Sequence, residues 1–415
     1  MNPFQEKAKD IEKTYKSWKS INVRPYDNET VDPYTRVRVI LMNGTEFEAI
    51  WNTSRYNRHC TNNDVRRAMA LIRRGEQQQQ KRIANLKPIN ESILEHTIGY
   101  EQLAVDLTAI LAQREKDANV KHQMDFALLE DFDHLYRYAD LLDFERGIHA
   151  EKLVGGYTEI MPGRPTVAEA RAPQDDIRFY INNYRSDPVT RLNIAIITAA
   201  EQQTMNYYLN VANLHDTELG RKLYSEIAMI EEQHVTGYGS LSDPTSDMFE
   251  CMVMHEYTEC YLYWSCYNDE TDERIKQLWL MHFEEELSHL HAAVRLLEKY
   301  NGKCWEQLFP EGGEFPQLLA FSEQKSYIRE VLKSVRLTGN AESYAEVDSL
   351  PDNFRFFSYN RAVQGNVKGL ASHVVIEETI KKFGKDYRVE DKAHPVRALA
   401  DHRSVNADVA RVKGA

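Results

Sequence analysis

The sequence predicts a mainly α-helical protein built around an antiparallel helical bundle. Apolar residues recur at helical spacing almost throughout residues 91–300. This stretch divides into three helical hairpins of similar length, and apolar side chains, at 42% of the chain, are numerous enough to fill a large core. With 415 residues the chain is too long for one small domain. We therefore expect a bundle with substantial extensions, or about two or three structural units.

Residues 1–90 predict a small mixed α/β extension. The segment 36–51 alternates between apolar and polar residues and carries Asn43-Gly44 at its centre, which is a strong β-hairpin signal because both turn residues need positive φ. A polar, helical stretch follows and includes the run Gln77–Gln80. We interpret this run as a solvated helix face without a function.

The three hairpins and their connections define a predicted helical domain, residues 91–305. The hairpins span 91–145, 187–238 and 247–300, and Asp187-Pro188 is typical of an N-cap followed by a first-turn proline. The long connection at 150–186 contains a Gly-Gly pair and three prolines, so we expect a crossover or a lid there. Residues 306–415 predict a C-terminal helical extension, with helices near 323–335 and 373–384, and a polar tail or arm.

Charge and cysteine usage exclude several classes of protein. The chain has 51 Lys and Arg against 64 Asp and Glu, a net charge of −13, which gives no bulk attraction to nucleic acid or anionic lipid. The five cysteines lack CxxC spacing, which argues against a disulfide framework or a zinc ribbon. The polar start lacks a secretory h-region, and no apolar run reaches membrane-spanning length. We expect a cytoplasmic protein without nucleic-acid or membrane partners.

Two of the 14 histidines follow a glutamate by three positions. Glu231 with His234, and Glu286 with His289, each place a carboxylate and an imidazole on one helix face. His255 and His291 are neighbours of these motifs in sequence but fall on other faces, so we interpret them as structural.

A constant spacing links these motifs to single carboxylates upstream. Glu201 stands thirty positions before Glu231, and Glu256 stands thirty positions before Glu286. Across a helical hairpin this offset brings the single glutamate level with its ExxH partner. The first hairpin repeats the pattern imperfectly, with Glu101 at the same distance before an Asp131-x-x-His134 motif. The chain therefore contains three half-sites.

Two facing half-sites supply the chemistry of a dinuclear metal centre. Four carboxylates neutralise two divalent cations, and without metal they would repel one another or take up protons in a bundle core. Carboxylate and imidazole ligands suit iron or manganese, so we expect two Fe ions per site, with Mn as the alternative. Such a centre leaves open positions for O2 or peroxide.

These residues resemble the ferritin-like superfamily of dinuclear carboxylate proteins, in particular rubrerythrin-type hairpins. The resemblance covers about 190–300 well and 91–145 loosely, on Glu201, Glu231/His234, Glu256 and Glu286/His289. It implies a ferritin-like antiparallel four-helix bundle extended by a third hairpin. It also implies bridging roles for Glu231 and Glu286, and terminal roles for Glu201 and Glu256.

The sequence leaves open which half-sites pair. We favour the second with the third, because their ligands are complete, although the segment between His234 and Glu256 is short for a crossover. The alternative pairs the first with the second across the 150–186 connection. A third possibility is that a leftover half-site meets its copy across a homodimer.

The expected function is that of a dinuclear iron or manganese oxidoreductase, of oxidase, oxygenase or peroxidase type, acting on O2 or peroxide and a small-molecule substrate. An external electron donor is expected, since the chain has no rubredoxin-type iron site, and the arms suggest a homo-oligomer. The alternatives are a ferroxidase or iron-handling protein and a metal-free structural scaffold.

Overall fold

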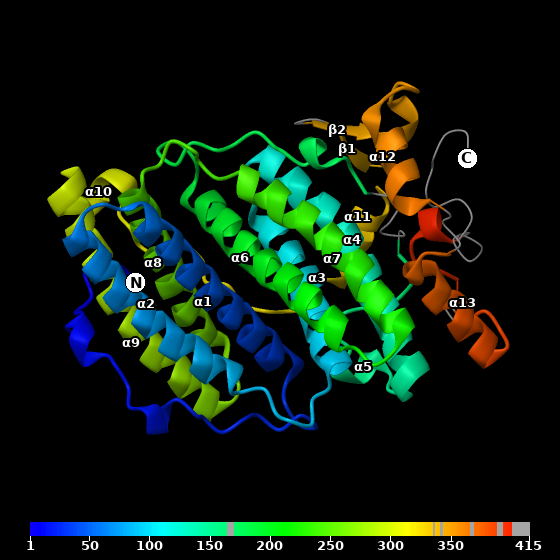
Figure 1. Cartoon of the computed structure of the whole chain (residues 1–415), viewed down its shortest axis with the longest axis horizontal. Helices are drawn as coiled ribbons and strands as arrows, with labels where there is room; N and C mark the ends of the chain where they lie inside the picture. Colours follow the sequence, from blue (N-terminus) through cyan, green and yellow to red (C-terminus); the bar gives the residue numbers. More distant parts are fainter. Residues whose placement is uncertain (164–169, 335–336, 341–342, 366–368, 388–392, 401–415) are drawn as a thin grey trace. The chain divides into compact units, whose positions relative to one another are not determined.

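The computed structural model describes the chain except residues 164–169, 335–336, 341–342, 366–368, 388–392 and 401–415, and the described part is mainly helical (Figure 1). Eight helices are long: α1 (Pro33–His59), α2 (Asn63–Ala84), α3 (Ile93–Arg114), α4 (Ala118–Arg146), α6 (Pro188–Val211), α7 (Glu218–Ser240), α8 (Met248–Asp269) and α9 (Glu273–Leu296). The shorter elements are α5 (Ala150–Leu153), α10 (Trp305–Leu308), α11 (Lys325–Leu332), α12 (Arg355–Gln364), α13 (Ala371–Phe383) and an antiparallel pair of strands, β1 (Leu337–Asn340) and β2 (Ser343–Glu346).

The chain folds into two compact units that interleave along the sequence. The first unit comprises residues 1–91, 180–203 and 242–321, and the second comprises 92–179, 204–241 and 322–415. The predicted division into 1–90, 91–305 and 306–415 differs from this arrangement, because the third hairpin folds with the N-terminal residues. Helix α6 contributes its first part to the first unit and its last part to the second.

Four long helices form the centre of the first unit. The hairpin α1–α2 packs on the hairpin α8–α9, with α1 against α8 and α2 against α9. Local signals fix the helix starts. Asp32 caps α1 by accepting a hydrogen bond from the Tyr34 amide at 2.8 Å, and Asp247 forms a capping box with Glu250 at the start of α8.

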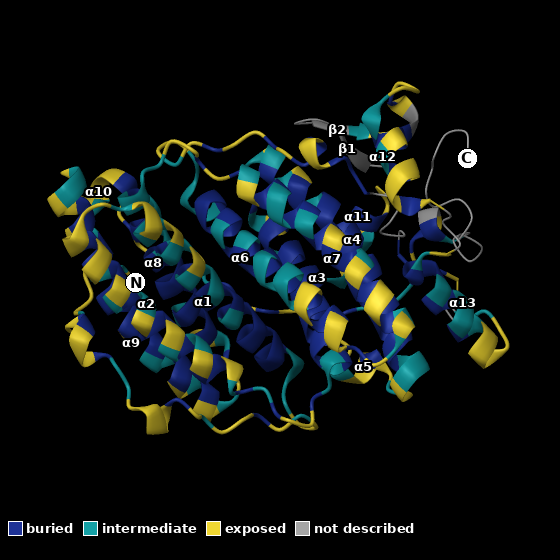
Figure 2. Cartoon of the chain, viewed as in Figure 1, coloured by how far each residue is buried: buried dark blue, intermediate teal, exposed yellow. Residues whose placement is uncertain are grey.

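The β-hairpin predicted at 36–51 is wrong, because these residues lie inside α1. Residues 34–42 are all buried, so this part of the helix has no solvated face (Figure 2). The sequence therefore lacks the alternation of apolar and polar faces that indicates an amphipathic helix. Gly44 is a helical residue rather than a turn residue. A Cβ at this position would lie 2.9 Å from Cβ of Gln203, so the glycine permits close packing of α1 on α6 within the first unit.

Replacing Gly44 by alanine is therefore expected to destabilise the protein by about 1–3 kcal/mol through overpacking. Gly239 is the matched control, since it is also helical but a Cβ added there would meet no atom within 4 Å. Gly239→Ala should instead stabilise by about 0.5–1 kcal/mol, because alanine loses less backbone entropy on folding. Urea denaturation compares the two free energies of unfolding. Equal stabilisation by both substitutions would contradict the close approach at Gly44.

The second unit is built on α3, α4, α7 and the end of α6. Ser92 and Glu95 form a capping box at the start of α3. The Asp187-Pro188 start predicted for α6 is confirmed by a 2.9 Å hydrogen bond from the Val189 amide to Asp187. The C-terminal helices α11 and α13 confirm the predicted helical segments, and both pack on α4. The polar tail or arm is predicted over the last 25 residues, of which 391–392 and 401–415 lie outside the described residues.

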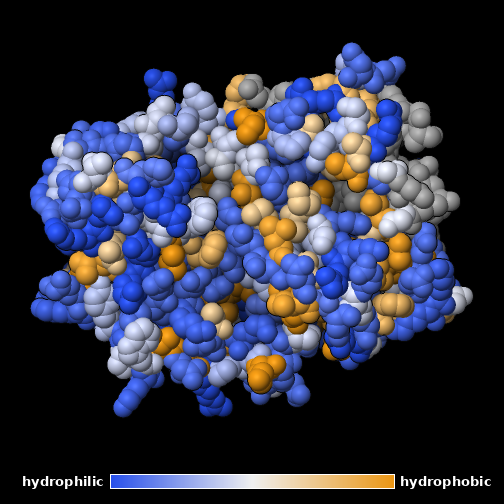
Figure 3. Space-filling model, in the orientation of Figure 1, coloured by the Kyte–Doolittle hydropathy of each residue, from blue (hydrophilic) through white to orange (hydrophobic). Residues whose placement is uncertain are grey.

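The surface is mostly hydrophilic, with small scattered hydrophobic groups on the face that Figure 3 displays. In the described residues we find no helix with both the length and the apolar character needed to cross a bilayer.

Candidate metal centres

A buried cluster of carboxylates and imidazoles lies between helices of the second unit. Glu101 on α3, Asp131 and His134 on α4, and Glu231 and His234 on α7 all have side chains with 0% exposure. These are five of the six predicted residues of the first and second half-sites, the sixth being Glu201. One oxygen or nitrogen atom from each of Glu101, His134 and Glu231 lies within 4.8 Å of the others.

Glu231 lies between the two imidazoles. Its Oε1 is 2.9 Å from Nδ1 of His134, and its Oε2 is 3.1 Å from Nδ1 of His234. Burial raises the pKa of Glu231, but His134 and then His234 outweigh it and hold that pKa well below its usual range. Both Nδ1 atoms also face further carboxylates. His234 Nδ1 is 3.3 Å from Asp131, and His134 Nδ1 is 4.0 Å from Glu101.

A second layer of polar groups orients these ligands. Nε2 of His234 contacts Oε2 of Glu130 at 2.8 Å, so the ring presents Nδ1 to the cluster. The hydroxyl of Tyr208, near the end of α6, donates a hydrogen bond to Glu101. Tyr208 is itself packed against Tyr138, at a centroid distance of 5.2 Å, and against Tyr224 at 5.7 Å. The buried wall beside Glu101 is therefore aromatic.

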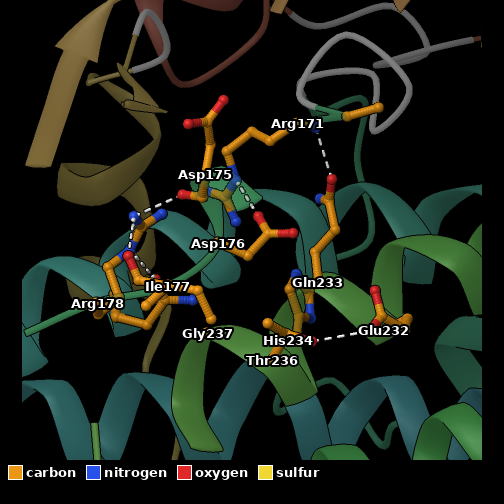
Figure 4. Close-up of polar contacts among 12 residues, drawn as sticks. Arg171, Asp175, Asp176, Ile177, Arg178, Glu232, Gln233, His234, Thr236 and Gly237 are labelled. Atoms are coloured by element: carbon orange, nitrogen blue, oxygen red, sulfur yellow. Dashed lines mark hydrogen bonds and ion pairs between the residues drawn. The ribbon is translucent and has the colours of Figure 1, made fainter. Parts of the chain in front are cut away.

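Part of the predicted crossover or lid is anchored next to His234. The backbone amide of Arg171 donates to the side chain of Gln233 at 2.6 Å (Figure 4). The guanidinium of Arg171 is fully buried, pairs with Asp176 at 2.8 Å and stacks over Phe126 at 4.0 Å. Arg178 reaches across to Gln123 on α4 at 3.0 Å. These buried contacts fix residues 171–178 over α4 and α7 and shield this end of the cluster from solvent.

A separate buried cluster lies in the first unit. Its core is Glu76 on α2, Glu256 on α8, and Glu286 and His289 on α9, with one ligand atom of each within 4.8 Å of the others. Nδ1 of His289 lies 2.9 Å from Glu76 and 3.2 Å from Glu286.

A second acidic group adjoins this core. Glu46 on α1 and Glu259 on α8 form a group with Glu76 under the same distance limit, so Glu76 belongs to both groups. Burial, followed by neighbouring carboxylates, raises the pKa values of Glu46 and Glu76 well above their usual range, and burial also raises that of Glu259.

Neutral and cationic side chains surround the cluster of the first unit. Gln79 donates a hydrogen bond to Glu286, and Tyr263 donates one to Glu46. His255 contacts Glu259 at 3.3 Å through Nε2 and Glu48 at 3.1 Å through Nδ1. Gln79 is thus buried against a predicted ligand, and the interpretation of Gln77–Gln80 as a solvated face is wrong at this position.

The half-sites combine differently from the favoured prediction. Glu231 and His234 face Asp131 and His134, so the first and second hairpins meet in the second unit. Glu256, Glu286 and His289 face Glu76 in the first unit, so the pairing of the second with the third hairpin is wrong. Glu201 is buried on the part of α6 that belongs to the first unit. It stays a predicted ligand, about two helical turns before Tyr208.

Sequence reasoning missed Glu46, Glu76 and Glu259. The signal for the first two was present, because Glu46 precedes Glu76 by the same interval as in the other hairpins. Gln79 follows Glu76 by three positions, where the other motifs have histidine. A search restricted to ExxH and DxxH could not find this half-site.

Comparison with known proteins gives no relative: no family model, no curated protein and no solved structure matches this chain. The chemistry of the two clusters therefore has to be argued from their own residues.

Proposed function

We propose that the second unit holds a dinuclear iron or manganese centre and that the protein is an oxidoreductase using O2 or peroxide. The ligands are Glu101, Asp131, His134, Glu231 and His234, with Glu201 as the sixth, expected from its spacing before Glu231. The observation that carries the proposal is the position of Glu231, whose two oxygens each face a different imidazole. That is the arrangement required of a carboxylate that bridges two ions with one imidazole each. We also propose a ferritin-like relationship, on the same motifs.

The donor set fits two divalent ions. Four carboxylates and two imidazoles balance the charge of two divalent cations, and iron and manganese accept this mixture of oxygen and nitrogen ligands. Nε2 of His134 is fully buried and has no hydrogen-bond partner among the described residues, and each oxygen of Glu231 faces an imidazole nitrogen. A bound pair of redox-active ions would supply electrons to O2 or peroxide.

The surrounding residues have roles that follow from their contacts. Glu130 contacts Nε2 of His234 and so orients the ring with Nδ1 toward Glu231 and Asp131, where that nitrogen would bind metal. The hydroxyl of Tyr208 keeps its proton and donates a hydrogen bond to the Glu101 carboxylate. This hydrogen bond restrains the orientation of that ligand. The buried Arg171–Asp176 pair keeps residues 171–178 in place and excludes water from one end of the site. A small-molecule substrate and an external electron donor complete the proposed reaction.

The test is spectroscopic and uses the full-length chain. Protein reconstituted anaerobically with Fe(II) and then exposed to O2 should develop a near-ultraviolet band of an oxo-bridged diferric pair. Dithionite should bleach the band, and renewed O2 should restore it, over repeated cycles. Uptake of many irons per chain would instead favour an iron-handling protein. Absence of bound iron, with unchanged thermal stability after chelation, would favour a metal-free scaffold and contradict the proposal.

A further inference from the structure

We infer that the first unit carries a second, independent divalent-metal centre, oxygen-rich in its ligands and preferring Mn2+. This centre shares no ligand with the proposed function, which rests on Glu101, Asp131, His134, Glu231 and His234, with Glu201 expected as the sixth ligand. Its ligands come from all four long helices at the centre of the first unit: Glu46, Glu76, Glu256, Glu259, Glu286 and His289.

The arrangement has room for two ions that share one carboxylate. One group is Glu76, Glu256, Glu286 and His289, and the other is Glu46, Glu76 and Glu259. Glu76 is common to both, in the position of a bridging ligand. Five carboxylates confined together and buried from water would be strongly destabilised as anions unless cations or protons neutralised them.

Unused ligand atoms point to a cation rather than to a network of hydrogen bonds. In the described part of the chain, Oε2 of Glu46, Oε2 of Glu76 and Oε1 of Glu259 are buried without a hydrogen-bond partner, and their residues are 0% exposed. A buried carboxylate oxygen without a hydrogen-bond donor raises the free energy of the folded state. A bound cation would remove this penalty at the three oxygens.

His289 is held in the orientation of a ligand. Its Nδ1 faces Glu76 and Glu286, whereas its Nε2 lies against the backbone of α2 at Gly75. A Cβ on residue 75 would lie 2.5 Å from that Nε2, so only glycine leaves the ring in this position. The glycine in the middle of α2 therefore has a packing reason tied to the imidazole.

The ligand set differs in kind from that of the second unit. Here one imidazole accompanies five carboxylates. Gln79 stands at the position where each of the other half-sites carries its histidine, so the described part of this unit has no second imidazole ligand. Oxygen ligands favour harder cations such as Mn2+ over zinc or copper. His255 contacts Glu259 at 3.3 Å and Glu48 at 3.1 Å, so an imidazole adjoins the centre without belonging to its ligand set.

A cavity of the first unit adjoins a residue that contacts this centre. A cavity of about 180 Å³ is lined by Glu48, His255 and Thr258 among other residues of the first unit. His255 stands between this cavity and Glu259, so its side chain forms part of the cavity wall and contacts a ligand of the centre.

The experiment counts metal in a protein whose other centre is disabled. In the Glu231→Gln background, dialysis against Mn2+ followed by elemental analysis should find about two Mn per chain, as expected for one four-helix centre. Adding Glu76→Gln, or in a second protein Gly75→Ala, should remove them and abolish the rise in melting temperature that Mn2+ causes. Glu284→Gln is the matched control on α9, because Glu284 is half exposed and pairs with Lys9.

The outcomes separate this inference from the proposed function. A folded Glu231→Gln protein that retains no Mn2+, or retention that is unchanged by both Glu76→Gln and Gly75→Ala, would overturn the inference. The reverse result, Mn2+ bound in the first unit but no oxygen-reactive iron in the second, would overturn the proposed function alone. Circular dichroism of each variant shows whether it is folded, and the Gly75→Ala protein keeps every carboxylate if Glu76→Gln does not fold.

Discussion

Glu231→Gln is expected to abolish the oxygen-dependent near-ultraviolet band and to weaken metal binding in the second unit by more than about 100-fold. The amide presents one oxygen and one NH2 group, so it cannot face both imidazoles as an anionic acceptor. His134 would lose its closest carboxylate contact, at 2.9 Å, and His234 would lose the closest carboxylate contact of its Nδ1 atom, at 3.1 Å. The measurement is iron titration followed by absorbance, on the variant and the wild type in parallel.

Glu232→Gln is the matched control for this prediction. Glu232 is the next residue on α7, but it is only half-buried and accepts a hydrogen bond from Thr236 at 2.8 Å (Figure 4). The band and the iron affinity of this variant should equal those of the wild type. If both variants behaved alike, Glu231 would not be a ligand and the proposed centre in the second unit would have to be abandoned.

Arg38→Met is expected to lower the free energy of unfolding by about 3–5 kcal/mol, because it leaves a buried carboxylate without its counter-ion. Arg38 is 2% exposed and binds Glu270 through Nε at 3.0 Å and Nη2 at 3.1 Å, and Asp269 through Nη1 at 2.6 Å. Trp279 also donates to Glu270 at 3.0 Å. The network joins α1 to the α8–α9 turn, and urea denaturation at pH 7 measures its loss.

The same pair gives a dependence on pH. Burial raises the pKa of Glu270, but Arg38 outweighs it, so the pKa lies below its ordinary value of 4.5. A carboxyl group with a lowered pKa in the folded state stabilises above its unfolded pKa, and this stability is lost as the pH falls through the folded value. The difference in stability between wild type and Arg38→Met should therefore shrink below about pH 4.5.

An exposed pair of the same type is the control. Arg67 contacts Asp64 at 2.9 Å, with side chains that are 76% and 66% exposed. Arg67→Met should change the free energy of unfolding by less than about 0.5 kcal/mol. A loss at Arg38 as small as the one at Arg67 would show that the buried network is not a source of stability.

Spacing predicted more of the sites than residue type did. The constant interval between paired carboxylates located five carboxylates of the described clusters, because the length of a helical hairpin fixes which residues come level. The ExxH and DxxH motifs located the imidazoles of α4 and α7. Requiring histidine at the third position hid Glu76, since Gln79 stands there. Asn43-Gly44 was also misleading. Residues 34–42 of α1 are all buried, so neither polarity nor periodicity marks them as a helix, and a glycine needed for packing resembles one needed for a turn.

The pairing of hairpins could not be read from ligand completeness. Each half-site has a carboxylate and an imidazole on one helix face, so its ligands are compatible with any of the other half-sites. Which one is met depends on the packing of whole helices, such as α1 on α8 and α4 on α7. The apolar and glycine contacts that decide this packing lie far apart in sequence, as at Gly44 and Gln203.

The interleaved order of the two units has a consequence for synthesis on the ribosome. The hairpin α1–α2 emerges first, but α8 and α9, which cover its buried glutamates, begin only at Met248. At translation rates of about 5–20 residues per second, the first hairpin waits roughly 10–30 s for its partners. Meanwhile the segments of the second unit up to Leu241 are already available to pack. Nascent chains released before Met248 would thus expose an acidic, apolar hairpin face, a target for chaperones and proteases rather than a folded intermediate.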